Sequence, residues 1–358
     1  MKPEQHFVKG RGAQINPGSS FSKLQYESLE VGDAQDEWEC EPEILRTHII
    51  PQRAKSIVNK IKSEDLPMAL SANPYQGCEH GCVYCYARST HEYWGFGAGL
   101  DFETKIIAKT NAAELLRQYF DKKSYQPEIL SLSMNTDCYQ PVERQLKLTR
   151  QLLEVCLEYR NPVSILTKNA LVLRDMDILQ ALHEHGLVSV SSSITCHDEN
   201  MRRKLEPRTS SIATRLKIIE SMAKAGIPTG LMFAPIIPGL NDAEMYSVLK
   251  SAADAGAERA GYTIVRLNGM IAEIFRDWLE KTYPDRAEKV WHSIESCHGG
   301  KVSDSRAFTR IVGEGHIAGI IRQQFKLFCQ KLGLNQHARQ LNHGAFRRPA
   351  PGGQLSLF

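Results

Sequence analysis

The sequence predicts an α/β fold, a partial TIM-like (β/α)6 barrel with an N-terminal extension and a C-terminal helical region. Three observations lead to this prediction. Between about residues 68 and 282, short apolar runs alternate with longer segments of helical periodicity. Glycine follows several of the helical segments, as is typical of helix ends. The 358 residues suffice for one barrel-sized domain. Strands that alternate with helices form parallel sheets through right-handed crossovers.

The predicted elements follow one another in chain order. The first strand begins near residue 68 and leads into a cysteine-rich loop, and a helix follows at about 111–122. Later strands are expected at Ile129–Met134, Pro162–Thr167, Leu187–Ile194, Pro228–Pro235 and Ala260–Leu267, and later helices at Val142–Tyr159, Asp175–His185, Ile212–Ala225, Asp242–Ala255 and Met270–Lys281. Six strand–helix units favour a partial barrel whose reactive groups lie at the C-terminal ends of the strands.

The periodicity also divides the chain into four parts. Residues 1–65 have little periodicity and are expected to form an extension, and residues 66–282 form the barrel. Residues 283–334 carry apolar residues at spacings typical of short helices, which suggests a helical cap. Residues 335–358 are polar and basic and then rich in Pro and Gly, which predicts a flexible tail that ends in an apolar hook.

Composition excludes several classes of protein. No run of about 18 apolar residues predicts a membrane span, and residues 1–12 lack the apolar centre of a secretory signal, so a cytoplasmic location is expected. Nine cysteines in such a chain do not indicate a disulfide framework. A net charge of +3 is too small to indicate nucleic-acid binding by itself.

The most informative motif contains Cys78, Cys82 and Cys85, with three residues and then two between them. This spacing brings three thiolates within reach of one metal centre. A cubane cluster normally takes four thiolates, so a set of three leaves one iron open for a small molecule. A zinc site with His80 or His91 as fourth ligand is the alternative, but no second Cys or His pair accompanies the motif.

The motif resembles that of the radical S-adenosylmethionine (SAM) superfamily, with Tyr84 just before the last cysteine. The resemblance implies a [4Fe-4S] cluster, S-adenosyl-L-methionine, a 5′-deoxyadenosyl radical and an external electron donor. Within the superfamily the chain is similar to the spore photoproduct lyase-like subgroup, a likeness carried by Tyr84 and Tyr86 around Cys85, Thr167–Lys168, Glu206–Ser211 with Arg215–Leu216, and 225–236.

The resemblance assigns cofactor-binding roles to seven residues. It places Lys168 at the cofactor carboxylate, Ser191 and Ser193 at the ribose or carboxylate, and Asn135 and Asp137 at the amino group, while Glu206 and Arg208 belong to a matching segment. A loop hydrogen bond is the alternative role for each of these polar side chains.

Catalytic roles are expected for three further residues. Tyr84 and Tyr86 either relay hydrogen atoms or cover the cluster. The lyase uses a cysteine as hydrogen-atom donor where this chain has Met134, and Cys138 lies four residues later. Either Cys138 has taken over that role and is catalytic, or it packs in the core and the chemistry differs.

Two segments suggest where the chemistry is used. Gln354, Leu355, Leu357 and Phe358 lie in a C-terminal peptide that resembles the docking peptide of proteins bound to the bacterial DNA sliding clamp. The basic stretch 202–208 either holds phosphates or is a solvated face. The leading hypothesis is a radical SAM enzyme that repairs or modifies a nucleic-acid base with lyase-like chemistry. The alternatives are radical chemistry on RNA, a peptide or a metabolite, and a non-enzymatic metal-stabilised module recruited to the clamp.

Overall fold

The computed structural model describes residues 8–17, 45–66, 68–337 and 339–349 and centres on a seven-stranded sheet. Six strands run parallel and in chain order across it: β3 (Leu70–Ala72), β6 (Leu130–Leu132), β7 (Val163–Thr167), β8 (Val188–Ser193), β9 (Thr229–Ile236) and β10 (Arg259–Ile264). β2 (Val58–Lys60) adds an antiparallel edge beside β3. The predicted α/β partial barrel of six parallel units is confirmed.

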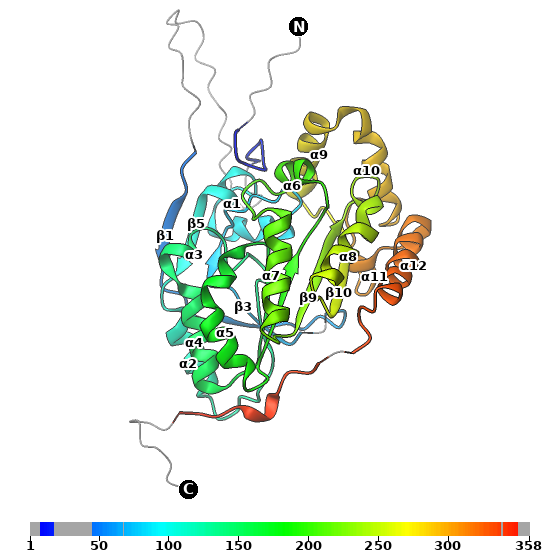
Figure 1. Cartoon of the computed structure of the whole chain (residues 1–358). Helices are drawn as coiled ribbons and strands as arrows, with labels where there is room; N and C mark the ends of the chain where they lie inside the picture. Colours follow the sequence, from blue (N-terminus) through cyan, green and yellow to red (C-terminus); the bar gives the residue numbers. More distant parts are fainter. Residues whose placement is uncertain (1–7, 18–44, 67, 338, 350–358) are drawn as a thin grey trace, which may run out of the picture.

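Helices cover the outer face of the sheet (Figure 1). They are α2 (Ala112–Phe120), α4 (Leu148–Tyr159), α5 (Met176–His183), α7 (Ile212–Lys224) and α8 (Met245–Asp254). The short α3 (Glu143–Leu146) precedes α4, and α9 (Met270–Thr282) follows β10 but lies at one end of the molecule (Figure 1). Gly186 and Gly226, at φ of 70° and 75°, follow α5 and α7 in the left-handed conformation that ends helices at low cost. The predicted helix at Val142–Tyr159 is divided in two at Lys147, whose φ is 52°.

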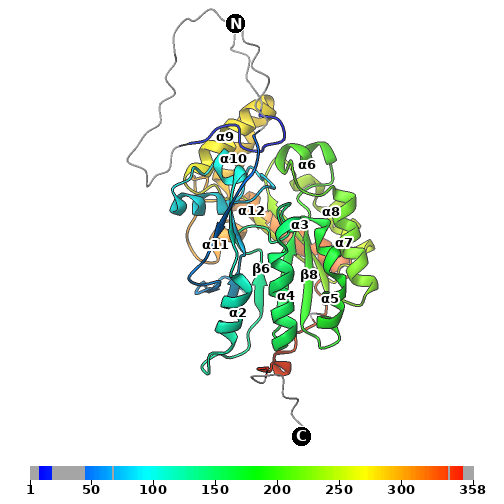
Figure 2. The same ribbon diagram turned by 90° about the vertical axis from the view of Figure 1, so that its left-hand side faces the viewer.

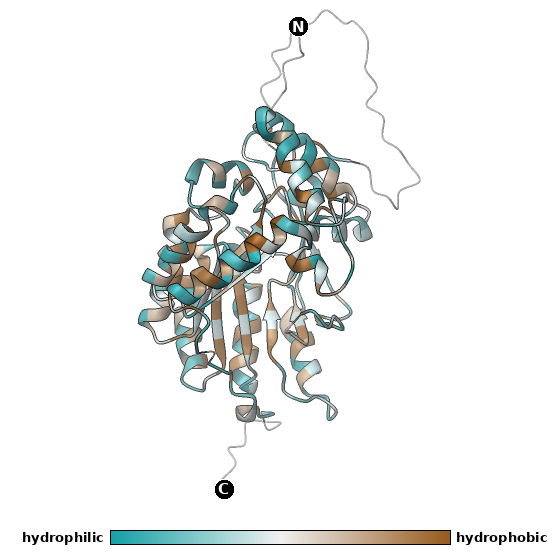
Figure 3. Ribbon diagram, turned by 90° about the vertical axis from the view of Figure 1, so that its right-hand side faces the viewer, coloured by the Kyte–Doolittle hydropathy of each residue, from teal (hydrophilic) through white to brown (hydrophobic). Residues whose placement is uncertain are grey.

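Buried and partly buried side chains alternate along strands such as β7, so that one face of the sheet packs against the helices and the other faces the inside of the partial barrel. In β7, Val163 and Ile165 are buried in an apolar cluster with helix residues, whereas Ser164 and Leu166 alternate with them and Leu166 lines a cavity. Two large apolar clusters lie between the strands and the helices. Figure 3 shows apolar strands enclosed by helices whose outward faces are largely hydrophilic. Within the described residues, no helix is both long and apolar enough to span a membrane.

The chain after the sixth unit forms α10 (Ala287–Ser296), α11 (Thr309–Val312) and α12 (Gly315–Lys331). α11 packs against β10, α12 packs against α8, and α10 packs against α9 and α12. α6 (Glu199–Leu205) lies between β8 and α7 and was not predicted from the sequence. In Figure 2, α9 and α10 lie at one end of the molecule.

The N-terminal segments pack against the chain that follows the cysteine loop. β1 (His48–Gln52) pairs with β5 (Lys105–Lys109), which also pairs with β4 (Tyr75–Gln76). Nearby lie α1 (Leu100–Thr104) and a 3-10 helix, η1 (Tyr86–Trp94). The backbone N–H groups of Gly12 and Ala13 donate to the buried Glu103 carboxylate at 3.0 and 2.8 Å. Part of the predicted extension is therefore built into the fold.

The C-terminal segment 339–349 forms a strap, which we name by these residues, along the N-terminal ends of the strands. The Asn342 N–H donates to the Gly186 carbonyl at 2.9 Å, and Arg348 Nε donates to the Phe120 carbonyl at 3.1 Å. Phe346 packs among Phe120, Tyr125 and Tyr159. In Figures 1 and 2 this segment (red) lies at the end of the molecule opposite α9. The expected flexible tail therefore differs from the structure up to residue 349, because aromatic packing fixes this part.

Candidate active site

The loop that carries the three cysteines is held in one conformation by the chain around it. Gly77 has a φ of 78°, and a Cβ atom there would lie 2.7 Å from the Lys105 carbonyl oxygen, so only glycine fits. The Cys78 N–H donates to the Phe102 carbonyl at 2.8 Å. The loop follows β3 and β4 and therefore lies at the C-terminal end of the parallel strands.

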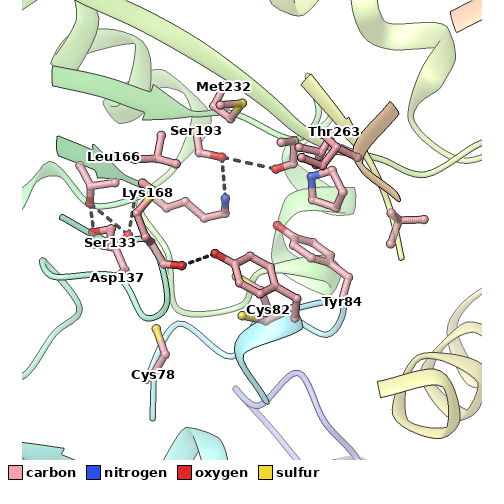
Figure 4. A pocket seen from close by; sticks show the side chains of 18 of the residues that line it. Cys78, Cys82, Tyr84, Ser133, Asp137, Leu166, Lys168, Ser193, Met232 and Thr263 are labelled. Atoms are coloured by element: carbon pink, nitrogen blue, oxygen red, sulfur yellow. Dashed lines mark hydrogen bonds between the residues drawn. The ribbon is translucent and has the colours of Figure 1, made fainter. Parts of the chain in front are cut away.

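Cys78, Cys82 and Cys85 line one cavity of about 450 Å³. None of the three forms a disulfide, and Figure 4 shows Cys78 and Cys82 on the same loop at the cavity wall. Burial raises the pKa of all three thiols, so thiolates in this cavity need a positive partner such as a metal centre. The three residues fit the open-sided iron–sulfur cluster that the spacing predicts.

The two histidines considered as zinc ligands have other surroundings. His80 lines the cavity, but its Nδ1 lies 3.4 Å from the Asp137 carboxylate. His91 is buried against Phe96 and Phe102 and does not line the cavity. Among the residues that the structure describes, no three His, Cys, Asp or Glu side chains converge as one zinc ion requires. A cluster that spreads its ligands over several irons does not need such convergence.

Lys168 and Ser193 meet at the C-terminal ends of β7 and β8. Lys168 Nζ donates to Ser193 Oγ at 2.6 Å, and both residues line the cavity (Figure 4). Ser191 lies two residues earlier on β8 and so on the same face of the sheet, but it is not among the lining residues. A cation and a hydroxyl thus face the same space as the cysteines.

Glu206 lies behind Lys168 as a fully buried carboxylate. It pairs with Arg215 at 2.6 Å, lies 3.8 Å from Lys168 Nζ and accepts a hydrogen bond from the Tyr84 hydroxyl. Burial by itself raises the pKa of a carboxyl group, but the charges of Arg215 and Lys168 lower the pKa of Glu206 to about 2. Glu206 does not line the cavity, and its contacts position Tyr84 and Lys168.

Asp137 lines the cavity with its carboxylate already engaged. It accepts hydrogen bonds from Thr167 Oγ1 and from the Lys168 N–H, both at 2.8 Å. These bonds tie the loop after β6 to the end of β7. The Tyr139 N–H at 2.8 Å and His80 Nδ1 at 3.4 Å also face the carboxylate, so most of its about four acceptor sites are already engaged.

The segment after β6 turns at Ser133, whose φ of 69° sends the next side chains in different directions. Met134 lines the cavity. Asn135 points elsewhere, and its amide donates to Gln76 Oε1 at 3.2 Å. Cys138 is fully buried in the apolar core and does not line the cavity. This placement agrees with a packing role for Cys138.

The basic stretch 202–208 does not form one cationic patch. Arg202 is 6% exposed, and its Nη1 donates to the Glu206 carbonyl at 3.0 Å. Arg208 Nη2 lies 3.4 Å from Glu79 Oε1 and does not line the cavity. Arg203 is exposed. The guanidinium of Arg202 is thus used within the fold.

Sequence reasoning missed Arg266, which lines the cavity just beyond β10. Its guanidinium carbon lies 5.8 Å from the centre of the Tyr86 ring, and the Tyr86 hydroxyl donates to the Met134 carbonyl at 2.5 Å. The available signal was a single charge within the otherwise apolar run 263–267, at the C-terminal end of a predicted strand.

Comparison with known proteins agrees with this site. The model of the radical SAM superfamily matches residues 72–252, which include the three cysteines, Lys168 and Ser193. The chain therefore belongs to the radical SAM superfamily. Members of this family use a [4Fe-4S] cluster and S-adenosyl-L-methionine and need an electron donor.

Proteins that are similar to this chain in sequence or fold include a bacterial protein, a phage enzyme and a lyase of known structure. An uncharacterized protein of Mycobacterium bovis is 34% identical over 234 residues, which are 64% of this chain and 69% of that protein. The radical SAM Nα-GlyT isomerase of Pseudomonas phage M6 is 25% identical over 173 residues, which are 48% of this chain and 34% of that enzyme. Spore photoproduct lyase complexed with dinucleoside spore photoproduct has a similar fold, with a TM-score of 0.56 and 15% identity over 80% of each chain.

The residues present fit the two cofactors of the family. Cys78, Cys82 and Cys85 would hold the cluster, which supplies one electron for cleavage of a carbon–sulfur bond of S-adenosylmethionine. Lys168 and Ser193 offer an ammonium and a hydroxyl at the same cavity for the carboxylate or ribose of the cofactor.

Proposed function

We propose that this radical SAM enzyme acts on nucleic acid and repairs or modifies a base with photoproduct lyase-like chemistry. The observation that carries the proposal is the composition of the cavity. Its lining contains the three cysteines and Lys168 and also four apolar side chains, Ile61, Leu66, Met68 and Ile311, which we call the apolar wall. A cavity of about 450 Å³ is of the size that binds small ligands, and an apolar wall suits a planar base.

One protein of similar fold supports this substrate class. It is spore photoproduct lyase, whose structure was determined in complex with dinucleoside spore photoproduct. A base stacked inside a duplex does not reach such a cavity, so the substrate must be single-stranded or have the base extruded. Removal of water by the apolar wall protects a reactive carbon centre during the reaction.

The test is anaerobic incubation of the reconstituted enzyme with S-adenosylmethionine, dithionite and irradiated DNA, followed by mass spectrometry of the nucleosides. Untreated DNA, RNA, a peptide mixture and a metabolite extract are the parallel substrates. We expect a changed base together with 5′-deoxyadenosine in the DNA reaction, and neither with Cys82→Ala. Stimulation of cofactor cleavage by only the peptides or the metabolites would refute the proposal.

We also propose that the enzyme is cytoplasmic and docks on the DNA sliding clamp through Gln354, Leu355, Leu357 and Phe358. These four residues lie outside the described part of the chain, so the support is the sequence alone. A labelled peptide of residues 345–358 is expected to bind purified clamp in fluorescence anisotropy, and an alanine version of the last two positions is not. Equal behaviour of both peptides would remove this part of the proposal.

A further inference from the structure

Two segments outside the six strand–helix units complete the cavity wall on the side where the sheet ends. β2 and β10 are the last strands of the sheet order and do not pair with each other in the described structure. Ile61 follows β2 and Ile311 lies in α11, and both line the cavity. Asp65 and Arg310 join these segments, since Arg310 Nε and Nη2 lie 2.7 and 2.6 Å from the carboxylate. We call this contact region the seam.

Arg310 is neutralised at the seam, whereas Arg266 is not. Among the residues that the structure describes, no carboxylate oxygen lies within 4.0 Å of the Arg266 guanidinium. Its guanidinium lies over the Tyr86 ring, and both side chains line the cavity. Burial lowers the pKa of Arg266, and the positive charge of Arg310 lowers it further. A half-buried cation without an anion is costly, and an anionic ligand group removes that cost.

An exposed aromatic side chain lies beside the same seam. Phe308 is 62% exposed, and its backbone is held at a φ of 65° while its N–H donates to Asp65 at 3.2 Å. Such a backbone conformation is unfavourable for a phenylalanine and persists only where neighbouring contacts impose it. The Arg266 guanidinium at the cavity wall and the exposed Phe308 ring beside the seam are two kinds of group that bind phosphate and stacked bases.

We propose that Arg266 binds a phosphate group of the substrate while the attached base lies against Tyr86 and the apolar wall. The inference rests on the proposed function, because it assigns an anchoring residue to a nucleic-acid substrate. The planar guanidinium donates two parallel hydrogen bonds to phosphate oxygens, which an ammonium does not reproduce. Phe308 stacks on a neighbouring base outside the cavity.

The test uses reconstituted holoenzyme with S-adenosylmethionine and a fluorescein-labelled single-stranded oligothymidylate, measured by anisotropy over a range of salt concentrations. Arg266→Met is expected to raise Kd about tenfold and to reduce the slope of log K against log salt by about 0.7, the value for one phosphate contact. Arg266→Lys is expected to keep the slope. The matched control is Arg53→Met, because the Arg53 side chain is 74% exposed and does not line the cavity.

A competition arm distinguishes a phosphodiester within a strand from a free nucleotide. With the wild type, thymidine monophosphate should displace the oligonucleotide at a lower concentration than thymidine does. With Arg266→Met, the two competitors should displace it at equal concentrations. If only the mononucleotide binds, Arg266 binds the phosphate of a small molecule, and the proposal of a phosphodiester within a strand is wrong. Iron content and circular dichroism check each variant, and Arg266→Gln replaces the methionine variant if that protein does not load iron.

The outcomes separate the two proposals. If the wild type binds the oligonucleotide and Arg266→Met has the same Kd and slope, the role of Arg266 is refuted while a nucleic-acid substrate still stands. If the wild type itself binds no oligonucleotide, the nucleic-acid proposal fails and takes the role of Arg266 with it.

Discussion

Replacement of Arg215 by methionine should reveal how strongly the buried ion pair behind the cavity stabilises the fold. Arg215 and Glu206 are both fully buried and lie 2.6 Å apart. Arg215→Met keeps much of the side-chain volume but leaves the Glu206 carboxylate without its nearest cation. Lys168, at 3.8 Å, compensates part of the charge.

Two routes give the magnitude. Breaking a buried pair by removing one partner costs about 3–5 kcal/mol, and the remaining Lys168 favours the lower end. The pKa of Glu206 is lowered from 4.5 to about 2, which at about 1.4 kcal/mol per unit corresponds to about 3 kcal/mol near neutral pH. Because this pKa is depressed, the stabilisation is complete well above the ordinary pKa and is lost as pH falls toward 2. For a chain of 358 residues, about 3 kcal/mol lowers Tm by about 4 °C.

Urea unfolding of cluster-loaded protein, followed by circular dichroism at neutral pH, measures the loss. The matched control is Arg117→Met, which breaks the exposed pair between Arg117 and Glu158 and should cost less than about 1 kcal/mol. The double variant Arg215→Met/Glu206→Gln should recover at least about 1 kcal/mol, because it removes the stranded charge. An Arg215→Met variant as stable as Arg117→Met would refute the reasoning.

Three further predictions concern the cluster, the buried histidine and the strap. Cys82→Ala should lose bound iron and all 5′-deoxyadenosine formation, measured by iron analysis and chromatography; retained iron would exclude Cys82 as a ligand. Burial lowers the pKa of His91 to about 4, so the unfolded chain binds a proton that the folded chain does not once pH falls below about 6.5. His91 should therefore contribute about 2 kcal/mol to the fall in the free energy of unfolding from pH 7 to pH 5, and His91→Phe should reduce the fall by that amount in urea titrations; an unchanged pH dependence would contradict the assignment. Phe346→Ala should cost about 1–2 kcal/mol without changing cofactor cleavage, whereas a loss of cleavage at equal stability would show that the strap acts on the site.

The sequence predicted the six parallel strands well because their signal is local. Each strand is a short apolar run, and glycines such as Gly186 and Gly226 mark the ends of the helices between them. α6 was missed because its residues 199–205 are mostly charged or polar, and its buried Arg202 looks like a surface residue in sequence. The strap was missed because Phe346 meets partners more than 180 residues away.

The site was predicted where it depends on spacing and not where it depends on turns. The three cysteines, Lys168 and Ser193 lie where a loop and strand ends place them. The left-handed turn at Ser133 directs Asn135 and Cys138 away from the cavity. A serine does not predict a positive φ, so this turn has no signal in the sequence. The roles expected for these residues stay predictions. Arg266 became recognisable only once β10 and the seam were placed beside the cysteine loop.

The strap 339–349 and the cavity lie at opposite ends of the parallel strands, so each can be altered without the other. It crosses the N-terminal ends of the strands, whereas Lys168 and Ser193 mark the opposite ends. The six residues of β8 alone separate these edges by about 20 Å. A fluorophore attached to the strap itself would therefore lie at the N-terminal ends of the strands, away from the cavity. The chain offers in this way a natural place for immobilisation that leaves the approach to the cysteine loop unobstructed.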